Sequence, residues 1–151
     1  MPHATLNFMD STRNIYIAVI DDDESLCRSM SRLLRADHLQ PITYSSAEAF
    51  LADTKRPKFD CLVLDIQLKG MTGLDLSRRL SAVKDATPVV FITAHDDPEV
   101  RAQAEASDCA GFFRKTDSGA DVLAAIRRAI SLEDSDSARK PGKPTELEPV
   151  P

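Results

Sequence analysis

The chain lacks features that define several classes of protein. Its cysteines, Cys27, Cys61 and Cys109, are odd in number and far apart, with no CxxC spacing. Neither a disulfide framework nor a zinc site is therefore indicated. The longest apolar runs are about six residues, far too short to span a membrane, and residues 1–14 have no signal-peptide pattern. We expect a soluble protein of the reducing cytoplasm, without membrane contact.

Signatures of nucleotide and nucleic-acid binding are also missing. Neither GxxxxGK nor GxGxxG occurs, so nucleotide binding has no support. The net charge of -5 argues against broad nucleic-acid binding in the absence of a local basic patch. The arginine pairs at 78–79 and 127–128 are typical of solvated helix faces. We therefore expect no direct nucleic-acid contact from this chain, whose 151 residues fit one domain.

Short apolar runs alternate with amphipathic stretches five times along the chain. This pattern predicts an α/β fold around a parallel sheet. The strands expected near residues 15–20, 61–64 and 89–92 are continuously apolar, as in strands covered by helices on both faces. A weaker strand near 40–44 contains Pro41, which favours a position at the edge of the sheet. A final strand is expected at 111–114.

Helices are predicted between these strands, at residues 24–36, after Ser45, after Gly73, at 98–106 and after Ser118. Ser45 and Glu48 have the spacing of a capping box at the start of the second helix. The fourth helix follows Asp97 and has only Val100 and alanines for its apolar face, so we expect it to be the least firmly anchored. We divide the chain into a flexible segment (1–14), a folded domain (15–132) and a disordered tail or linker (133–151).

Charged or hydroxyl residues stand where four of the strands end: Asp21, Asp22, Asp65, Thr93 and Lys115. In an open parallel sheet the carboxyl ends of the strands share one edge, where ligands bind. Two carboxylates about 5 Å apart repel by about 3 kcal/mol at an effective dielectric constant of about 20. Three of them together therefore predict a divalent cation. Oxygen ligands favour Mg²⁺.

The remaining residues of this group suit a phosphoryl group. Lys115 offers a positive charge and Thr93 a hydroxyl, the types needed to bind phosphoryl oxygens. Asp65 stands alone at the end of a central apolar strand and is the candidate nucleophile, able to accept the group as an acyl phosphate. Each residue alone also has an ordinary structural interpretation. Their coincidence in order and position indicates a site, whereas Asp23 is expected to serve only the helix start.

Residues 18–23, 64–73, 92–95 and 111–115 together resemble the receiver domains of two-component response regulators, over about residues 15–132. The resemblance implies a flavodoxin-like (βα)5 domain with a five-stranded parallel sheet in the order 2-1-3-4-5. It also implies that a sensor histidine kinase or a histidine phosphotransfer protein donates a phosphoryl group to Asp65. The domain would then be a signalling domain that assists its own phosphorylation and dephosphorylation, rather than an enzyme.

The resemblance also assigns roles to the metal ligands. Asp22 would bind Mg²⁺ directly and Asp21 mostly through water. Asp65 and the backbone carbonyl of Gln67 would be further ligands.

Other residues would bind the phosphoryl group and transmit its arrival. Thr93 and Lys115 would hold its oxygens, and the rotamer of Phe112 would report activation. Gln67 and His95 would flank the path of attacking water and set the phosphate lifetime. The changed surface would lie on the fourth helix, fifth strand and fifth helix, and would bind an unknown downstream protein or form a phosphorylation-dependent homodimer.

The chain departs from the family pattern at two loop positions. Lys69 replaces a usual proline, which predicts a freer and more positively charged loop after Asp65. Thr116 replaces the proline that normally follows the lysine in a cis peptide. A non-proline cis bond costs about 3–4 kcal/mol, so we expect either a trans bond with a reshaped loop or a strained cis bond.

Several alternatives remain open. The chain is interpreted as a stand-alone receiver, as the receiver half of a transcription factor with 133–151 as linker, or as a pseudo-receiver that works unphosphorylated. A haloacid-dehalogenase-type phosphatase fits poorly, because Gln67 stands where that class has a second aspartate. A calcium loop starting at Asp21 fails, because Leu26 replaces its glycine and Arg32 its last glutamate.

Overall fold

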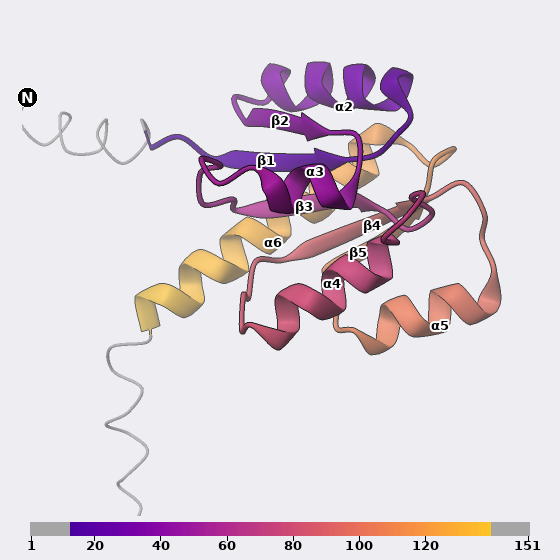
Figure 1. Cartoon of the computed structure of the whole chain (residues 1–151). Helices are drawn as coiled ribbons and strands as arrows, with labels where there is room; N and C mark the ends of the chain where they lie inside the picture. The colour runs from indigo at the N-terminus through magenta and orange to yellow at the C-terminus, as the bar shows by residue number, and fades with distance from the viewer. Residues whose placement is uncertain (1–12, 140–151) are drawn as a thin grey trace, which may run out of the picture.

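The structure, a computed structural model, describes residues 13–139, and their side chains as far as Leu132. Within this range five strands alternate with five helices (Figure 1). They are β1 (Tyr16–Ile20), α2 (Glu24–Ala36), β2 (Gln40–Tyr44), α3 (Ala47–Ala52), β3 (Cys61–Asp65), α4 (Gly73–Ala82), β4 (Val89–Thr93), α5 (Pro98–Ala106), β5 (Gly111–Arg114) and α6 (Gly119–Arg139). All neighbouring strands are parallel, in the order β2-β1-β3-β4-β5. The predicted fold class and strand order are confirmed.

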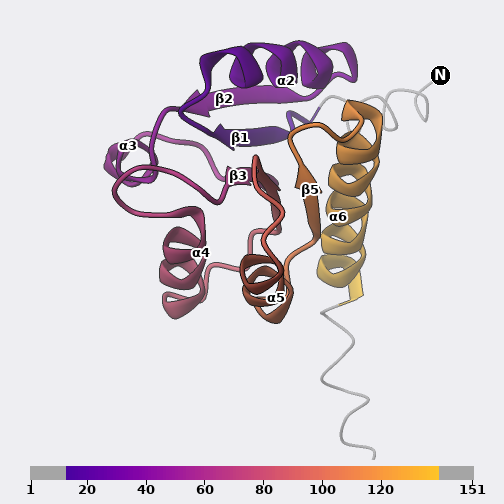
Figure 2. The same cartoon turned by 90° about the vertical axis from the view of Figure 1, so that its right-hand side faces the viewer.

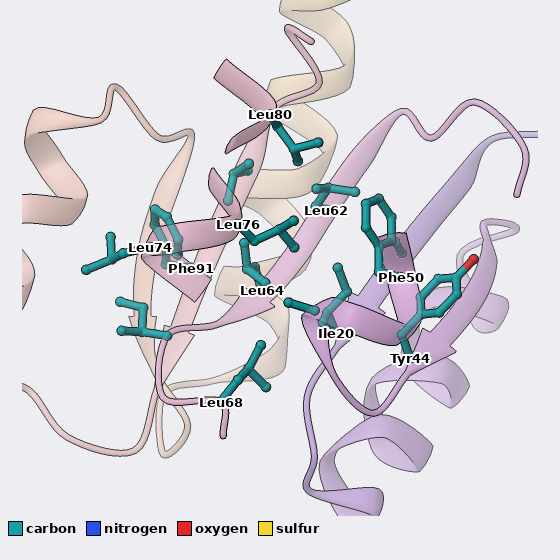
Figure 3. Close-up of a cluster of buried hydrophobic side chains, with 14 of the residues drawn as sticks. Ile20, Tyr44, Phe50, Leu62, Leu64, Leu68, Leu74, Leu76, Leu80 and Phe91 are labelled. Atoms are coloured by element: carbon teal, nitrogen blue, oxygen red, sulfur yellow. The ribbon is translucent and has the colours of Figure 1, made fainter. Parts of the chain in front are cut away.

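Helices cover both faces of the sheet, as the continuously apolar strands predict. Successive residues of a strand point to opposite faces, so each strand supplies both layers of the core. In β1, Ile17 and Val19 pack with Leu34 of α2 and with α6. Ile20 packs on the other side with α3, α4 and α5, where Figure 3 shows it near Leu64 and Phe50. Figure 2 shows the resulting three layers.

Several local predictions are confirmed. The first helix has the predicted bounds, and the side chain of Asp23 caps it by accepting hydrogen bonds from the N–H groups of Ser25 and Leu26. β2 lies at the edge of the sheet. α5 begins after its N-cap Asp97 and buries a single residue, Ala104, whereas α4 buries four.

The predicted capping box of Ser45 and Glu48 is wrong. The N-cap is Ser46, whose Oγ accepts a hydrogen bond from the N–H of Ala49 at 2.9 Å. Because the helix starts one residue later than predicted, Glu48 is its second residue and its carboxylate turns to the N–H of Met71. A capping box occurs instead at the start of α4.

The last helix continues past the predicted end of the folded domain. α6 runs to Arg139, whereas the sequence places the boundary at Leu132, where the apolar periodicity stops. Polar residues with adequate helix propensity extend a helix without an apolar face, so periodicity alone ends it too early. At the other end, Arg13 contacts Asp60, with Nη1 and Oδ1 at 3.2 Å. Residues 1–12 and 140–151 of the predicted terminal segments lie outside the described residues. From residue 13 to residue 139, no helix is both long and apolar enough to cross a membrane.

Candidate functional site

The carboxyl ends of β1 and β3 and the residue after β5 bring three charged side chains into contact. Nζ of Lys115 lies 3.0 Å from Oδ2 of Asp21 and 3.4 Å from Oδ2 of Asp65. The carboxylates are almost fully buried, with 2% and 3% of their side chains exposed, and the lysine is 18% exposed. β3 lies between β1 and β4, so parallel pairing alone brings Asp65 next to the end of β1. The predicted meeting of these residues is confirmed.

Asp21 has an unusual electrostatic environment. Its Oδ1 accepts hydrogen bonds from the N–H of Asp23 at 2.8 Å and from Nζ of Lys115 at 3.1 Å. Its buried Oδ2 accepts no hydrogen bond of good geometry from the described part of the chain, despite its closeness to the same Nζ. Burial, together with the charge of Asp65, raises the pKa of Asp21 to about 6. The pocket therefore holds more negative charge than one lysine neutralises.

Lys115 remains charged in this pocket. Burial by itself would lower the pKa of Lys115, but the hydrogen bond to Asp21 and the charges of both carboxylates outweigh it and raise the pKa above its ordinary value. Asp65 is fixed on its other side, where Oδ1 accepts a hydrogen bond from the N–H of Gln67 at 3.0 Å. The ammonium of Lys115 and the carboxylate of Asp65 are therefore both held in place by hydrogen bonds.

Asp22 completes a group with the donor atoms of a metal site. Carboxylate oxygens of Asp21, Asp22 and Asp65 lie within 4.8 Å of one another, and Asp22 is exposed to solvent. Three hard oxygen donors open to solvent on one side match Mg²⁺, which keeps several waters when bound to protein. The unsatisfied Oδ2 of Asp21 supports the same fit, because it can accept a hydrogen bond from a metal-bound water. The residues present therefore fit a divalent cation.

Thr93 reaches the same edge, where its hydroxyl is bonded to the backbone of the following loop. Its fully buried side chain donates a hydrogen bond to the carbonyl oxygen of His95 at 3.0 Å and accepts one from the N–H of that residue at 3.1 Å. Its backbone carbonyl accepts the N–H of Lys115 at 2.8 Å. The imidazole of His95 and the side chain of Gln67 belong to exposed residues at the rim.

Phe112 lies in β5, away from the acidic pocket, and is partly buried against the core. The guanidinium of Arg101, in α5, lies 4.4 Å from the centre of its ring. Asp96, in the loop after Thr93, accepts a hydrogen bond from Nε of Arg101 at 3.2 Å. The loop after β4, α5 and the aromatic ring are thus joined by one side chain.

The two departures from the family pattern have clear structural outcomes. The peptide bond between Lys115 and Thr116 is trans, like every other bond between residues 13 and 139. The loop closes through Asp117 instead, whose Oδ2 accepts the N–H of Arg114 at 2.8 Å and whose N–H donates to the carbonyl of the same residue. Of the two expected alternatives, the trans bond is the one observed. Lys69 is exposed, and the next residue, Gly70, has φ of 76°.

Three residues of the site region were not predicted from the sequence. Cys27 donates from Sγ to the backbone carbonyl of Asp21 at 3.3 Å, and burial, with the neighbouring carboxylates, raises its pKa to about 11. Asp117 and Glu48 each accept a backbone N–H in a loop of the site. Apolar periodicity carries no signal for such side-chain bonds.

Cavity volume alone does not locate the site. Hollows of about 740 and 710 Å³ lie near Phe59 and Thr87, at the opposite edge of the sheet. A smaller one, of about 490 Å³, borders Lys115 between α2 and the start of α6. The gathered carboxylates and the lysine therefore identify the site.

The order of the five strands and the position of the acidic pocket define the class of flavodoxin-like domains with a ligand site at the carboxyl edge of the sheet. Residues 17–127 match the sequence profile of the family described as "Response regulator receiver domain". The chain belongs to this family.

Individual relatives support the same family assignment. The chain is 33% identical over 131 residues to the response regulator protein TodT of Pseudomonas putida, covering 87% of this chain and 58% of TodT. It is 31% identical over 114 residues to the transcriptional regulatory protein FixJ of Azorhizobium caulinodans, covering 76% of this chain and 54% of FixJ. This chain therefore spans less than two thirds of the length of either relative.

Solved structures of receivers superpose well on this chain. The response regulator StyR gives a TM-score of 0.76 at 32% identity, covering 89% of this chain and 69% of StyR. The structure titled FixJ-N gives 0.71 at 28% identity, covering 80% of this chain and 96% of FixJ-N.

Proposed function

We propose that the chain is a phosphoacceptor receiver of a two-component phosphorelay. A histidine kinase or a histidine phosphotransfer protein donates a phosphoryl group to Asp65, and the domain passes the signal on through its surface. The observation that carries this proposal is the position of Lys115, with Nζ within 3.4 Å of two buried carboxylates from other strands. One cation between two acids suits a site that accepts a phosphoryl group and a divalent cation together.

Four residues would hold Mg²⁺ in this proposal. Asp22, Asp65 and the backbone carbonyl of Gln67 bind it directly, and Asp21 does so mostly through water. When bound, the cation neutralises charge on the phosphoryl oxygens. The buried and unsatisfied Oδ2 of Asp21 supports this assignment.

The transfer breaks one bond and forms another. A carboxylate oxygen of Asp65 forms a bond to phosphorus, the bond between phosphorus and the donor histidine nitrogen breaks, and its electron pair stays on that nitrogen. The ammonium of Lys115 turns from the carboxylates to a phosphoryl oxygen. Hydrolysis later returns Asp65 to a carboxylate, with Gln67 and His95 beside the path of the attacking water. The domain thus assists reactions at its own residue.

The switch follows from the position of Thr93. To donate to a phosphoryl oxygen, its hydroxyl must leave the carbonyl of His95, which releases the loop before α5. That loop is tied to Phe112 through Asp96 and Arg101, so its movement reaches β5 and α5. The surface that changes is formed by α5, β5 and α6, and its partner is a downstream protein or a second copy of the chain.

Intact-mass spectrometry tests the proposal. The protein is incubated with Mg²⁺ and acetyl phosphate, alongside Asp65→Asn and a sample with EDTA. We expect one added phosphoryl group on the unaltered protein and none on the other two samples. The absence of any added mass, also after incubation with phosphorylated histidine donors, would contradict the proposal and favour a receiver that works unphosphorylated.

A second candidate is the receiver part of a transcription factor, with the residues beyond 132 as a linker to another domain. It is favoured by the name of FixJ, a transcriptional regulatory protein, of which the chain covers 54%. The encoding reading frame tests it. A DNA-binding domain in the same frame would support this candidate, and a stop codon directly after residue 151 would exclude it.

A further inference from the structure

The loop after Asp65 carries the backbone carbonyl of Gln67, yet the residues in the middle of this loop make few contacts that would fix its conformation. Its two ends are held, because Leu68 is buried in the core (Figure 3) and the N–H of Gly73 donates to the carbonyl of Ile66 at 3.0 Å. Lys69 and Gly70 between them are exposed. A lysine leaves φ free where a proline would fix it.

One side chain from a different helix reaches this exposed middle. Oε2 of Glu48, in α3, accepts a hydrogen bond from the N–H of Met71 at 2.8 Å, across 23 positions of sequence. In the described part of the chain, this is the one hydrogen bond that joins residues 67–71 to a helix other than α4. The carboxylate does not cap its own helix, because Ser46 provides the cap.

The shape of the loop fits around this carboxylate. Gly70 has φ of 76°, and a Cβ at this position would lie 2.7 Å from Oε2 of Glu48. A Cβ at this position would displace the carboxylate, and the positive φ of Gly70 itself favours glycine. The bond to Met71 lowers the pKa of Glu48, so the group is ionised at neutral pH and accepts a charge-assisted hydrogen bond.

We propose that Glu48 is a positioning residue of the metal site, whose hydrogen bond to the N–H of Met71 holds the loop that presents the Gln67 carbonyl to a divalent cation. This inference rests on the proposed function, since it assumes that Mg²⁺ binds at Asp22 and Asp65. Glu48 does not touch the cation. It acts through the backbone, as outer-shell groups that orient metal ligands do.

The test compares the Mg²⁺ affinity of the full chain by calorimetry for wild type, Glu48→Ala, Glu48→Gln and Glu99→Ala. Glu99 is the matched control, because it is also the second residue of its helix and is exposed. We expect Glu48→Ala to weaken Mg²⁺ binding about three- to tenfold, and Glu48→Gln, which keeps an acceptor oxygen, to stay within about twofold of wild type. Glu99→Ala should bind like wild type.

Hydrogen exchange gives a readout that does not depend on the metal. In EDTA, the amide of Met71 should exchange faster in Glu48→Ala than in Glu48→Gln, while amides of β3 stay protected in both, showing that the fold survives.

Three outcomes would overturn the inference alone. The first is equal Mg²⁺ affinity of wild type and Glu48→Ala. The second is a Met71 amide that exchanges at the same rate in Glu48→Ala as in Glu48→Gln. The third is a Glu48→Gln variant that binds Mg²⁺ as weakly as Glu48→Ala, which would show that Glu48 acts through its charge and not through the hydrogen bond to Met71. Wild type that binds no Mg²⁺ would overturn the proposed function together with this inference, so the two failures are distinguishable.

Discussion

The hydroxyl of Thr93 is bonded to the backbone of His95, both as donor and as acceptor, and not to Asp65. A site that is ready for a phosphoryl group therefore has its hydroxyl in a different hydrogen-bonded arrangement. In the proposed function, moving it exchanges two local bonds for one to a charged oxygen, which would couple phosphorylation of Asp65 to the loop that leads into α5.

Thr93→Val should separate phosphorylation from its consequence. We expect the variant to take up the phosphoryl group at Asp65 but to remain monomeric where the phosphorylated wild type dimerises, as measured by light scattering. The N–H and C=O of His95 lose their partly buried hydrogen bonds to the hydroxyl, so the free energy of unfolding should fall by about 1–2 kcal/mol. Thr93→Ser keeps the hydroxyl and serves as control. A monomeric wild type in both states would reject the dimer, and a phosphorylated Thr93→Val that dimerises would reject the role of the hydroxyl.

Lys115→Met should have opposite effects on metal binding and on phosphorylation. The variant removes a cation that competes with Mg²⁺ for Asp21 and Asp65, so Mg²⁺ affinity measured by calorimetry should rise about three- to tenfold. Phosphorylation from acetyl phosphate should be lost. Without metal, the two carboxylates lose their partner, and the free energy of unfolding should fall by about 1–3 kcal/mol.

Lys69→Met is the control for this change of charge. Lys69 is exposed, and the screened charge should alter Mg²⁺ affinity by less than about twofold. Weaker Mg²⁺ binding in Lys115→Met would contradict the account of two cations in competition.

The stability of the metal-free protein should depend on pH through Asp21. Its pKa is about 6 in the folded protein and 3.8 ordinarily, so between these values the folded state binds more protons than the unfolded state. This contribution to stability is full below pH 3.8 and is lost as the pH rises to 6.

Denaturant unfolding in EDTA at several pH values, with Asp21→Asn alongside, measures this contribution. Relative to wild type, Asp21→Asn should gain stability as the pH rises, and should exceed wild type by about 1–2 kcal/mol at neutral pH. Saturating Mg²⁺ should remove this advantage, because the cation stabilises the ionised wild type. A difference between the two proteins that does not change with pH would contradict the raised pKa.

The lifetime of the phosphorylated state should depend on the two rim residues. Gln67→Ala and His95→Ala should each change the dephosphorylation rate by about threefold or more if, as we propose, their side chains flank the path of the attacking water. The rate is followed by intact mass after removal of the phosphodonor. Unchanged rates in both variants would reject this role.

The sequence predicts the position of the acidic pocket well. The alternation of apolar runs places Asp21, Asp65 and Lys115 at strand ends, and parallel pairing brings those ends together at one edge of the sheet. It does not predict the direction in which Thr93 points, since a buried hydroxyl chooses among local partners that only the folded loop presents.

Side-chain contacts between elements that are distant in the sequence are not predicted either. The bond from Glu48 to Met71 replaces a predicted capping box, and a shift of one residue in the helix start decides between them. The end of α6 was placed too early, because apolar periodicity marks the packed part of a helix and not its length.

The most direct test of the central claim is to locate the phosphoryl group. Protein incubated with Mg²⁺ and acetyl phosphate is reduced with borohydride, which converts an aspartyl phosphate to homoserine, and its peptides are sequenced by tandem mass spectrometry. The account predicts conversion at Asp65 and at no other aspartate, with none in EDTA. Conversion at Asp21 or Asp22, or unmodified Asp65 in protein that binds Mg²⁺, would contradict it.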